Sequence, residues 1–273
     1  MKIQVIIPVI NLWEKYTKQC IDSVKSKNHE LRILLIDNAS TDETSREAGA
    51  MVSSTFSHKR NEERWSVSKS WNYGIKDAWE RGFDYVLVLN NDILLNPDCI
   101  DNLVDRFEKD VKGKDGLAWA RQPGDIVLVS AMDVRGECKE PQNVLAIDSK
   151  TVTAEEAPHP NYSCYMINKK CWDIVGEFDE GFFPAYYEDN DHHRRIKLAG
   201  LQAIVYPPAL FYHYGSRTQN EALEKPIVDS SNTERYFISK WGGKPDTEGL
   251  YTTPLNNPAN TIKSVKQNNY ENK

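Results

Sequence analysis

Several widespread functional motifs are missing from this 273-residue sequence. There is no GxGxxG after the first apolar stretch and no GxxxxGK[ST], so a dinucleotide-binding Rossmann domain and a P-loop phosphotransferase lose support. There is also no GxSxG nucleophile elbow, and no histidine and cysteine cluster has zinc-binding spacing. These absences argue against several common classes of enzyme and against a structural zinc site.

The sequence also lacks an excess of positive charge, CxxC cysteine pairs and long apolar runs. Its formal net charge of -6 argues against a non-specific nucleic-acid binder, and we expect no nucleic-acid partner. Five cysteines without a CxxC pair favour reduced thiols in a cytosolic protein. No apolar run approaches the roughly 18 residues that span a bilayer, and the start, MKIQVIIPVINLW, is interpreted as a first strand rather than a signal peptide. We therefore expect a cytoplasmic protein without a transmembrane segment, and peripheral contact with the inner membrane face stays open.

Apolar stretches alternate with amphipathic ones along the first half of the chain. The β-rich and mainly apolar stretches at Ile3–Val9, Leu31–Asp37 and Tyr85–Leu89 predict strands buried on both faces. Apolar residues at helical spacing at about Trp13–Lys25 and Trp65–Arg81 predict helices between them. This alternation predicts a parallel sheet with helices on both faces, whose ligands collect at the carboxyl ends of the strands.

The second half of the chain is less regular. We expect a strand at Asp125–Val134, a polar and proline-rich loop at Lys139–Pro160, and a helix in EDNDHHRRIKLAG that Gly200 ends. The segment QAIVYPPALFYHYG is predicted to hold two short strands. The last residues, about 241–273, carry few aliphatic side chains and predict a loosely ordered polar tail.

Polar side chains follow two of the predicted strands. Asp37 and Asn38 lie in IDNASTD, and YVLVLNND ends in Asn90, Asn91 and Asp92. An acid or amide at such an edge can hydrogen-bond a base or ribose, and a carboxylate with amide neighbours suits a hard divalent cation. A turn with a helix cap explains IDNASTD equally well, and an ordinary strand end is the better explanation of NND taken alone.

Two further segments carry side chains suited to catalysis. AYYEDNDHHRRI places Glu188, Asp189 and Asp191 within four positions, and crowding raises the proton affinity of at least one, which suits general-base work. Acids at a helix N-terminus are also favourable with the helix dipole. The preceding aromatics, FFPAYY, fit either a binding wall or a core. His213 in YHYGS can bind a divalent metal as a neutral imidazole, although a lone histidine is more often structural.

In combination, these segments resemble glycosyltransferase family 2. The resemblance rests on the order of VIIPVIN, LLIDNASTD, WNYGI, VLVLNNDILLNPDCI, GEFDEGFFPAYYEDNDHHRRIKLAG and YPPALFYHYGS, and it covers about residues 3–217. It is closest to the rhamnosyltransferase-like and galactofuranosyltransferase-like branch. The resemblance implies an α/β GT-A fold: a mostly parallel, Rossmann-like sheet flanked by helices, with a C-terminal acceptor-side subregion. It implies one domain at 1–240, with a nucleotide-binding half at about 1–115 and an acceptor and catalytic half at about 116–240.

The resemblance also assigns roles to individual residues. It implies a nucleotide-binding set of Pro8, Val9, Asp37, Asn38, Lys69, Asn72, Asn90 and Asn91. It implies that Asp92 and His213 bind a Mn or Mg ion and that Asp189 is the catalytic base, with Glu188 beside it. The acceptor-binding aromatics would be Trp172, Phe183, Tyr186 and Tyr187, together with Phe182. Two departures stand out: Asn90 replaces the first acid of the family's D-x-D, and the approach to N-x-G reads RWSVSKSWNYG, without the usual glycines.

The implied function is that of an inverting, metal-dependent glycosyltransferase acting in polysaccharide biosynthesis. The donor would be a nucleoside diphosphate sugar, with dTDP-rhamnose or a UDP-sugar favoured, and the acceptor a hydroxyl of a glycan, glycolipid or glycoprotein. A sugar-nucleotide nucleotidyltransferase is one alternative, but it should carry a glycine-rich basic loop where PVINLWEKYTK has no glycine. The other is a non-catalytic nucleotide- or carbohydrate-binding module of the same fold, which Asn90 favours.

Overall fold

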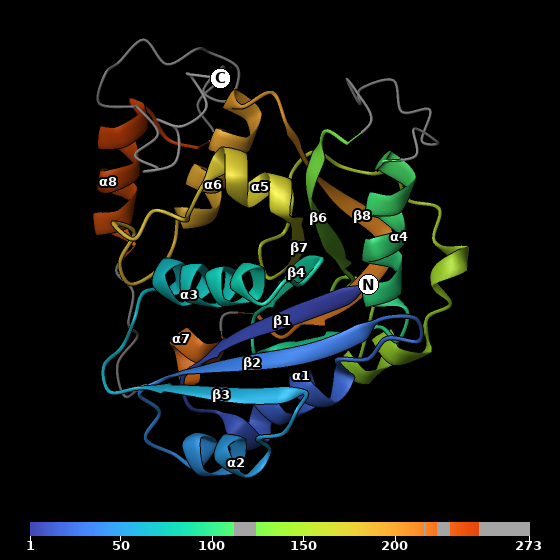
Figure 1. Ribbon diagram of the computed structural model, residues 1–273, viewed down its shortest axis with the longest axis vertical. Helices are drawn as coiled ribbons and strands as arrows, with labels where there is room; N and C mark the ends of the chain where they lie inside the picture. Colours follow the sequence, from blue (N-terminus) through green and yellow to red (C-terminus); the bar gives the residue numbers. More distant parts are fainter. Residues whose placement is uncertain (112–123, 216, 223–229, 246–273) are drawn as a thin grey trace.

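The described part of the chain folds into an eight-stranded mixed sheet with helices packed on both faces (Figure 1). The computed structural model describes residues 1–111, 124–215, 217–222 and 230–245. Most of the predicted tail at 241–273 lies outside the described residues. Within the described part of the chain, no helix combines the length and apolarity needed to cross a membrane.

The first half of the chain forms the parallel side of the sheet. Strand β1 pairs with β2 and β4, and β2 pairs with β3, all in parallel. The strands are continuous and apolar because helices cover them from both sides. The elements in chain order are β1 (Lys2–Val9), the helical turn η1 (Trp13–Thr17), α1 (Lys18–Ser23), β2 (Glu30–Asn38), α2 (Thr44–Ala50), β3 (Phe56–Asn61), α3 (Val67–Glu80) and β4 (Tyr85–Leu89).

The second half extends the sheet to the order β3-β2-β1-β4-β7-β6-β8-β5. Strand β7 is antiparallel to both β4 and β6, β8 is parallel to β6, and β5 is antiparallel to β8. The sheet is therefore mostly parallel but mixed. The elements are β5 (Ile93–Leu95), α4 (Cys99–Val111), β6 (Ile126–Asp133), η2 (Pro141–Ala146), η3 (Ser149–Thr151), β7 (Cys164–Asn168), α5 (Lys169–Val175), α6 (Glu188–Leu198), β8 (Gln202–His213), α7 (Arg217–Glu221) and α8 (Ser231–Trp241).

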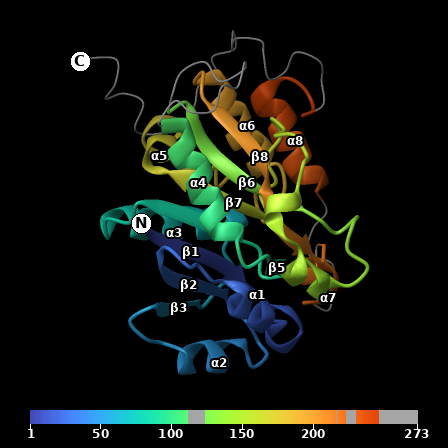
Figure 2. The same ribbon diagram turned by 90° about the vertical axis from the view of Figure 1, so that its right-hand side faces the viewer.

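Two apolar clusters hold the layers together. On one face, side chains of α1, α2 and α4 pack on alternate positions of the central strands, such as Ile7 and Leu87. On the other face, α3, α5 and α6 pack on the intervening positions, such as Ile6 and Val88. Figure 2 shows the helices on the two sides of the sheet. Successive strand residues point to opposite faces, so both sets are buried.

Some elements differ from the sequence expectations. QAIVYPPALFYHYG forms one strand, β8, and not two short ones; a register shift opposite Ala131 and Met132 accommodates its two prolines. The expected loop at Lys139–Pro160 contains the short 3-10 turns η2 and η3. The sequence interpretation did not include β5, α7 or α8. All five cysteines have free thiols.

Candidate active site

The predicted site residues gather at one edge of the sheet because the parallel strands end there together. Val9 at the end of β1 pairs in register with Asp37 near the end of β2. Asn90, Asn91 and Asp92 follow β4, which is parallel to β1. This edge is the usual ligand-binding position in open α/β sheets.

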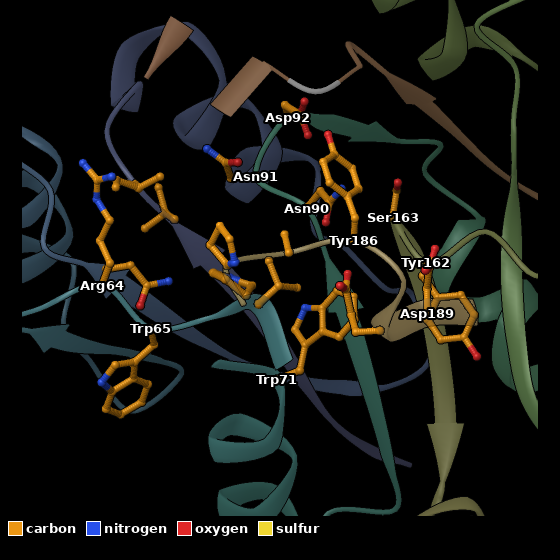
Figure 3. A pocket seen from close by; sticks show the side chains of 18 of the residues that line it. Arg64, Trp65, Trp71, Asn90, Asn91, Asp92, Tyr162, Ser163, Tyr186 and Asp189 are labelled. Atoms are coloured by element: carbon orange, nitrogen blue, oxygen red, sulfur yellow. The ribbon is translucent and has the colours of Figure 1, made fainter. Parts of the chain in front are cut away.

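A cavity of about 470 Å³ lies at this edge (Figure 3). Its wall includes side chains from the strand ends, from the segment before α6 and from the end of β8. In Figure 3 the labelled Asn90, Asn91 and Asp92 follow one wall, and Tyr186 is drawn between Asp92 and Asp189. The lining residues that the sequence singled out are Pro8, Val9, Asn38, Asn90, Asn91, Asp92, Phe183, Tyr186, Glu188, Asp189 and His213.

Asp92 and His213 form a buried acid and imidazole pair in this wall. Strand β5 pairs Ile93 with His213, which brings the histidine next to Asp92. Nε2 of His213 lies 3.2 Å from Oδ1 of Asp92, and the backbone N–H of Arg217 donates to Oδ2 at 3.0 Å. Burial raises the pKa of Asp92, but the contacts with His213 and Arg217 outweigh it, so the pKa is lowered overall. The carboxyl is therefore held ionised.

Glu188 and Asp189 begin α6 and both line the cavity. Tyr187 precedes them in the left-handed region, with φ 71°, and this backbone turn directs the chain into the helix. Burial raises the pKa of Asp189, and burial followed by the neighbouring charge of Asp189 raises that of Glu188 well above its usual value. Oε2 of Glu188 is buried without a hydrogen-bond partner among the described residues. Both acids therefore hold a proton more tightly than free carboxyl groups do.

Asp191, the third acid of the cluster, has a different environment. It is fully buried, and Nε of Arg195 donates to its Oδ2 at 2.9 Å. Nε1 of Trp241 donates to its Oδ1 at 2.9 Å, and Nζ of Lys240 lies 2.6 Å from the same oxygen. Asp191 is not among the residues that line the cavity. The acidic cluster thus divides into two cavity-facing acids and one that is paired inside the protein.

Comparison with known proteins places this chain in a family. A model described as Glycosyl transferase family 2 matches residues 4–139, which contain most of β1, all of β2 to β4 and the Asn90-Asn91-Asp92 segment. The chain belongs to glycosyltransferase family 2. A curated relative, a galactofuranosyl glycosyltransferase of Leishmania donovani, is 22% identical over 160 residues, which cover 50% of this chain and 37% of the relative. The chain thus spans little more than a third of that relative's length.

Solved structures support the same GT-A-like fold. A mannosyltransferase from Pyrobaculum calidifontis, in complex with GDP-Man and Mn²⁺, matches 77% of this chain and 56% of its own, with a TM-score of 0.51 and 18% identity. GalNAc-T7 with UDP, GalNAc and Mn²⁺ matches 87% of this chain and 54% of its own, with a TM-score of 0.57 and 15% identity. S. aureus TarS 1-349 gives a TM-score of 0.53 at 15% identity, over 86% of this chain and 69% of its own.

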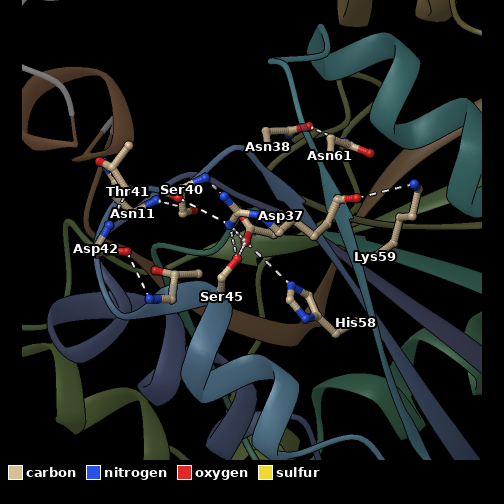
Figure 4. Close-up of polar contacts among 12 residues, drawn as sticks. Asn11, Asp37, Asn38, Ser40, Thr41, Asp42, Ser45, His58, Lys59 and Asn61 are labelled. Carbon is tan, nitrogen blue, oxygen red and sulfur yellow. Dashed lines mark hydrogen bonds and ion pairs between the residues drawn. The ribbon is translucent and has the colours of Figure 1, made fainter.

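In this family 2 chain, Asp37 and Asn38 point to opposite faces of β2, as successive strand residues must. Asp37 faces α2, where it accepts from the Ser40 backbone N–H at 2.8 Å and from Ser45 Oγ (Figure 4). Burial raises the pKa of Asp37, but contacts with His58 and these serines outweigh it and lower it well below its usual range. Asp37 therefore does not line the cavity, whereas Asn38 does.

Asn38 is held in the cavity wall by other polar side chains. Its Nδ2 donates to Ser70 Oγ at 3.1 Å, and its Oδ1 accepts from Asn61 Nδ2 at 2.9 Å. Asn91 lines the same cavity and donates to Thr17 Oγ1 at 3.0 Å. Both amides therefore have fixed orientations toward the cavity.

Four more predicted residues do not line the cavity. Nζ of Lys69 lies 4.7 Å from the ring centre of Trp65, which does line it. Asn72 exchanges hydrogen bonds of 2.8 and 2.9 Å with the backbone of Phe178. Trp172 belongs to the apolar core, and Tyr187 packs on the ring of Phe237. Their predicted roles in binding remain predictions that this placement does not support.

Sequence reasoning also missed residues that line the cavity. The missed lining residues include Arg64, Trp65, Trp71, Tyr162 and Ser163. Trp71 falls on the apolar stripe of α3, so its spacing indicated core, and it is indeed 3% exposed. No local motif marks the others, because they reach the cavity only through the packing of α3 and β7 against β4.

Asp92 and His213 fit a divalent cation. A carboxylate oxygen and an imidazole nitrogen are both ligands of such ions. Nε2 of His213 is buried without a hydrogen-bond partner among the described residues, although it lies 3.2 Å from Oδ1 of Asp92. No group of three potential ligands gathers in the described residues. The protein would therefore provide two ligands and leave the remaining positions to phosphate oxygens and water.

Proposed function

We propose that this chain is an inverting glycosyltransferase that moves a sugar from a nucleoside diphosphate sugar to an acceptor hydroxyl. The observation that carries the proposal is that Asp92, His213 and Asp189 line the same cavity. The ionised Asp92 beside the His213 imidazole suits the part of the cavity that would hold the donor diphosphate. Asp189, whose pKa is raised, suits removal of the proton from the acceptor hydroxyl. Membership of glycosyltransferase family 2 supports the same reaction class.

In the proposed reaction, the acceptor oxygen attacks the anomeric carbon as the bond from that carbon to the diphosphate oxygen breaks. The acceptor proton passes to Asp189, and the nucleoside diphosphate leaves with the bonding electrons. General-base assistance of this kind is typically worth about 100- to 10,000-fold. Displacement from one side by one base inverts the anomeric configuration, through an oxocarbenium-like state.

Asp92 and His213 would hold a Mn or Mg ion, which as a Lewis acid supplies charge neutralisation for the leaving diphosphate. Asn38 and Asn91, oriented by their hydrogen bonds, would bind the nucleotide. Phe183, which is 58% exposed, and Tyr186, which is 36% exposed, would contact the acceptor at the mouth of the cavity. The favoured donors are dTDP- and UDP-sugars, and the favoured acceptors are glycans, glycolipids and glycoproteins.

The test is the release of nucleoside diphosphate from a panel of UDP-, dTDP-, GDP- and CDP-sugars, with and without MnCl₂. At least one donor should be slowly hydrolysed, faster with the ion and faster again with an oligosaccharide acceptor. Tight nucleotide binding by calorimetry without any turnover would instead identify a non-catalytic binding module. Formation of a nucleotide sugar from sugar phosphate and nucleoside triphosphate would identify a nucleotidyltransferase.

A further inference from the structure

Helix α8 packs against the segment that leads into α6, and α6 begins with Glu188 and Asp189 (Figures 1 and 2). Phe237 and Trp241 of α8 form a buried cluster with Phe182 of that segment. Helix α8 lies outside residues 4–139, the part that the family model matches. The contact therefore joins α8 to the segment that precedes the two acids of the cavity.

Lys240 on α8 joins a partly buried acid, Asp179, to a fully buried one, Asp191. Its Nζ lies 2.6 Å from Oδ2 of Asp179 and 2.6 Å from Oδ1 of Asp191. The Lys240 side chain is 7% exposed, and those of Asp179 and Asp191 are 20% and 0% exposed. A buried ammonium needs such partners because its own desolvation is costly. One ammonium thus connects two carboxylates that lie on either side of Glu188 and Asp189 in the sequence.

The Asp179 end of this segment has a second attachment to α8. Tyr236 donates from its hydroxyl to Oδ2 of Asp179 at 3.1 Å. Gly181 leaves room for the Tyr236 ring, because a Cβ at this position would lie 2.6 Å from the tyrosine hydroxyl. At the other end, Asp191 is also held by Arg195 and Trp241. Both ends of the segment are therefore attached to α8, with Lys240 in contact with each.

The opposite side of the segment is attached to α3. The Asn72 side chain exchanges hydrogen bonds with the backbone of Phe178, and the Val67 backbone N–H donates to the Pro184 carbonyl at 3.0 Å. Helices α3 and α8 thus hold the segment between them. The cavity-facing part is less well packed, since Phe183 is 58% exposed.

We propose that Lys240 is a positioning residue: by bridging Asp179 and Asp191 it fixes the segment so that Asp189 faces the acceptor hydroxyl. This inference rests on the proposed function of Asp189 as the base. Asp189 contributes to the rate only when its carboxylate is within hydrogen-bond reach of the acceptor hydroxyl. Fixing the segment costs conformational entropy, and because the folded protein has already ordered it, the reaction does not have to. The nucleotide side of the cavity, built on β1, β2 and β4, does not depend on this bridge.

The decisive variant is Lys240→Met, which keeps the length of the side chain and removes its charge. We expect kcat to fall about 10- to 100-fold per folded molecule, because small misplacements of reacting groups have effects of this size. The Kd for UDP or dTDP with MnCl₂ should stay within about twofold. Lys244→Met is the matched control, since Lys244 lies just after α8 and pairs with Glu234 at an exposed site. An unchanged kcat in Lys240→Met, with only thermal stability lowered, overturns the proposal.

Asp179→Asn provides a second variant if Lys240→Met does not fold. It removes one end of the bridge and leaves Asp191 with Lys240, Arg195 and Trp241, so a smaller fall in kcat is expected. An unchanged kcat in this variant also counts against the bridge.

Hydrogen–deuterium exchange separates this inference from the proposed function, because it needs no activity. In both variants, exchange should rise in residues 179–190 and stay unchanged in β1 to β4. A uniform rise over the whole chain contradicts a positioning role. Localised exchange in a protein that turns over no donor would support the bridge and refute the transferase.

Discussion

The imidazole of His213 lies 3.2 Å from the carboxylate of Asp92, although the two residues are far apart in the sequence. Strand pairing produces this contact, because the short β5 runs antiparallel to the end of β8 and places Ile93 opposite His213. An acid that follows one strand is thereby joined by a histidine that ends another. Together they form the part of the cavity that fits a divalent cation.

Replacing Asp92 should therefore remove metal-dependent nucleotide binding. We expect Asp92→Ala to weaken the binding of UDP or dTDP in MnCl₂ by at least about tenfold, and EDTA to weaken wild-type binding similarly. Isothermal titration calorimetry measures both. Asp105→Ala, at an exposed position of α4, is the control. If Asp92→Ala binds nucleotide with wild-type affinity, the ion binds elsewhere.

Asp189→Asn should abolish transfer without preventing nucleotide binding. The amide keeps the shape of the side chain but cannot accept the acceptor proton, so kcat should fall about 100- to 10,000-fold. Steady-state kinetics and calorimetry on the same preparation measure the two properties. Asp173→Asn on α5, which removes a partly exposed acid paired with Lys169, should keep full activity. Wild-type turnover in Asp189→Asn would rule out the base assignment.

The raised pKa of Asp189 predicts how the rate depends on pH. A base works only when ionised, so kcat should decrease as pH falls through a midpoint above the ordinary aspartate value of about 3.9. The kcat profile at saturating donor and acceptor, measured from neutral to mildly acidic pH, shows this midpoint. The residual activity of Asp189→Asn should lack this decrease. A wild-type profile that stays flat across this range contradicts the prediction.

Glu188 should destabilise the folded protein at neutral pH. Its folded-state pKa is raised, so the native state binds a proton more tightly than the unfolded state, and stability falls as pH rises above the unfolded value of about 4.3. Glu188→Gln should therefore be more stable by about 1 kcal/mol at pH 7, a gain in Tm of about 2–4 °C. The gain should shrink at about pH 4. Differential scanning calorimetry of the variant and the wild type at the two pH values measures this difference in Tm. A variant less stable than wild type at pH 7 refutes the prediction.

Phe183 and Trp172 should respond differently to truncation, because one is 58% exposed and the other 4%. Phe183→Ala should raise the acceptor KM while changing stability by less than about 0.5 kcal/mol. Trp172→Ala should cost about 3–5 kcal/mol of stability, as expected for a core aromatic residue. Chemical denaturation and acceptor titration separate the two effects. If Phe183→Ala leaves the acceptor KM unchanged, the acceptor binds elsewhere.

Much of the fold could be predicted because buried parallel strands leave a direct record in the sequence. Strands β1, β2 and β4 each contain a run of apolar residues bounded by polar ones, and the helix α3 shows a clear apolar stripe. Strand β5 has only three residues and forms through its pairing with β8, so no local sequence pattern could predict it.

The candidate site could be predicted only in part. The family motif located Asp92, Asp189 and His213, and these residues do line one cavity. It also pointed to Asp37, but His58, Ser40 and Ser45 hold that carboxylate on the other face of β2. The sequence contained no signal for this outcome, because the contact with His58 depends on how β3 pairs with β2.

By itself, the sequence determined which residue types stand at the carboxyl ends of the strands, since apolar runs and their polar boundaries are local properties. Tertiary structure alone decided which acids face the cavity. Asp189 lines it, whereas Asp191, two positions later, is neutralised by Arg195 and by Lys240 of α8. The physical reason is that burial and charge pairing depend on side chains from distant parts of the chain, which only folding brings together.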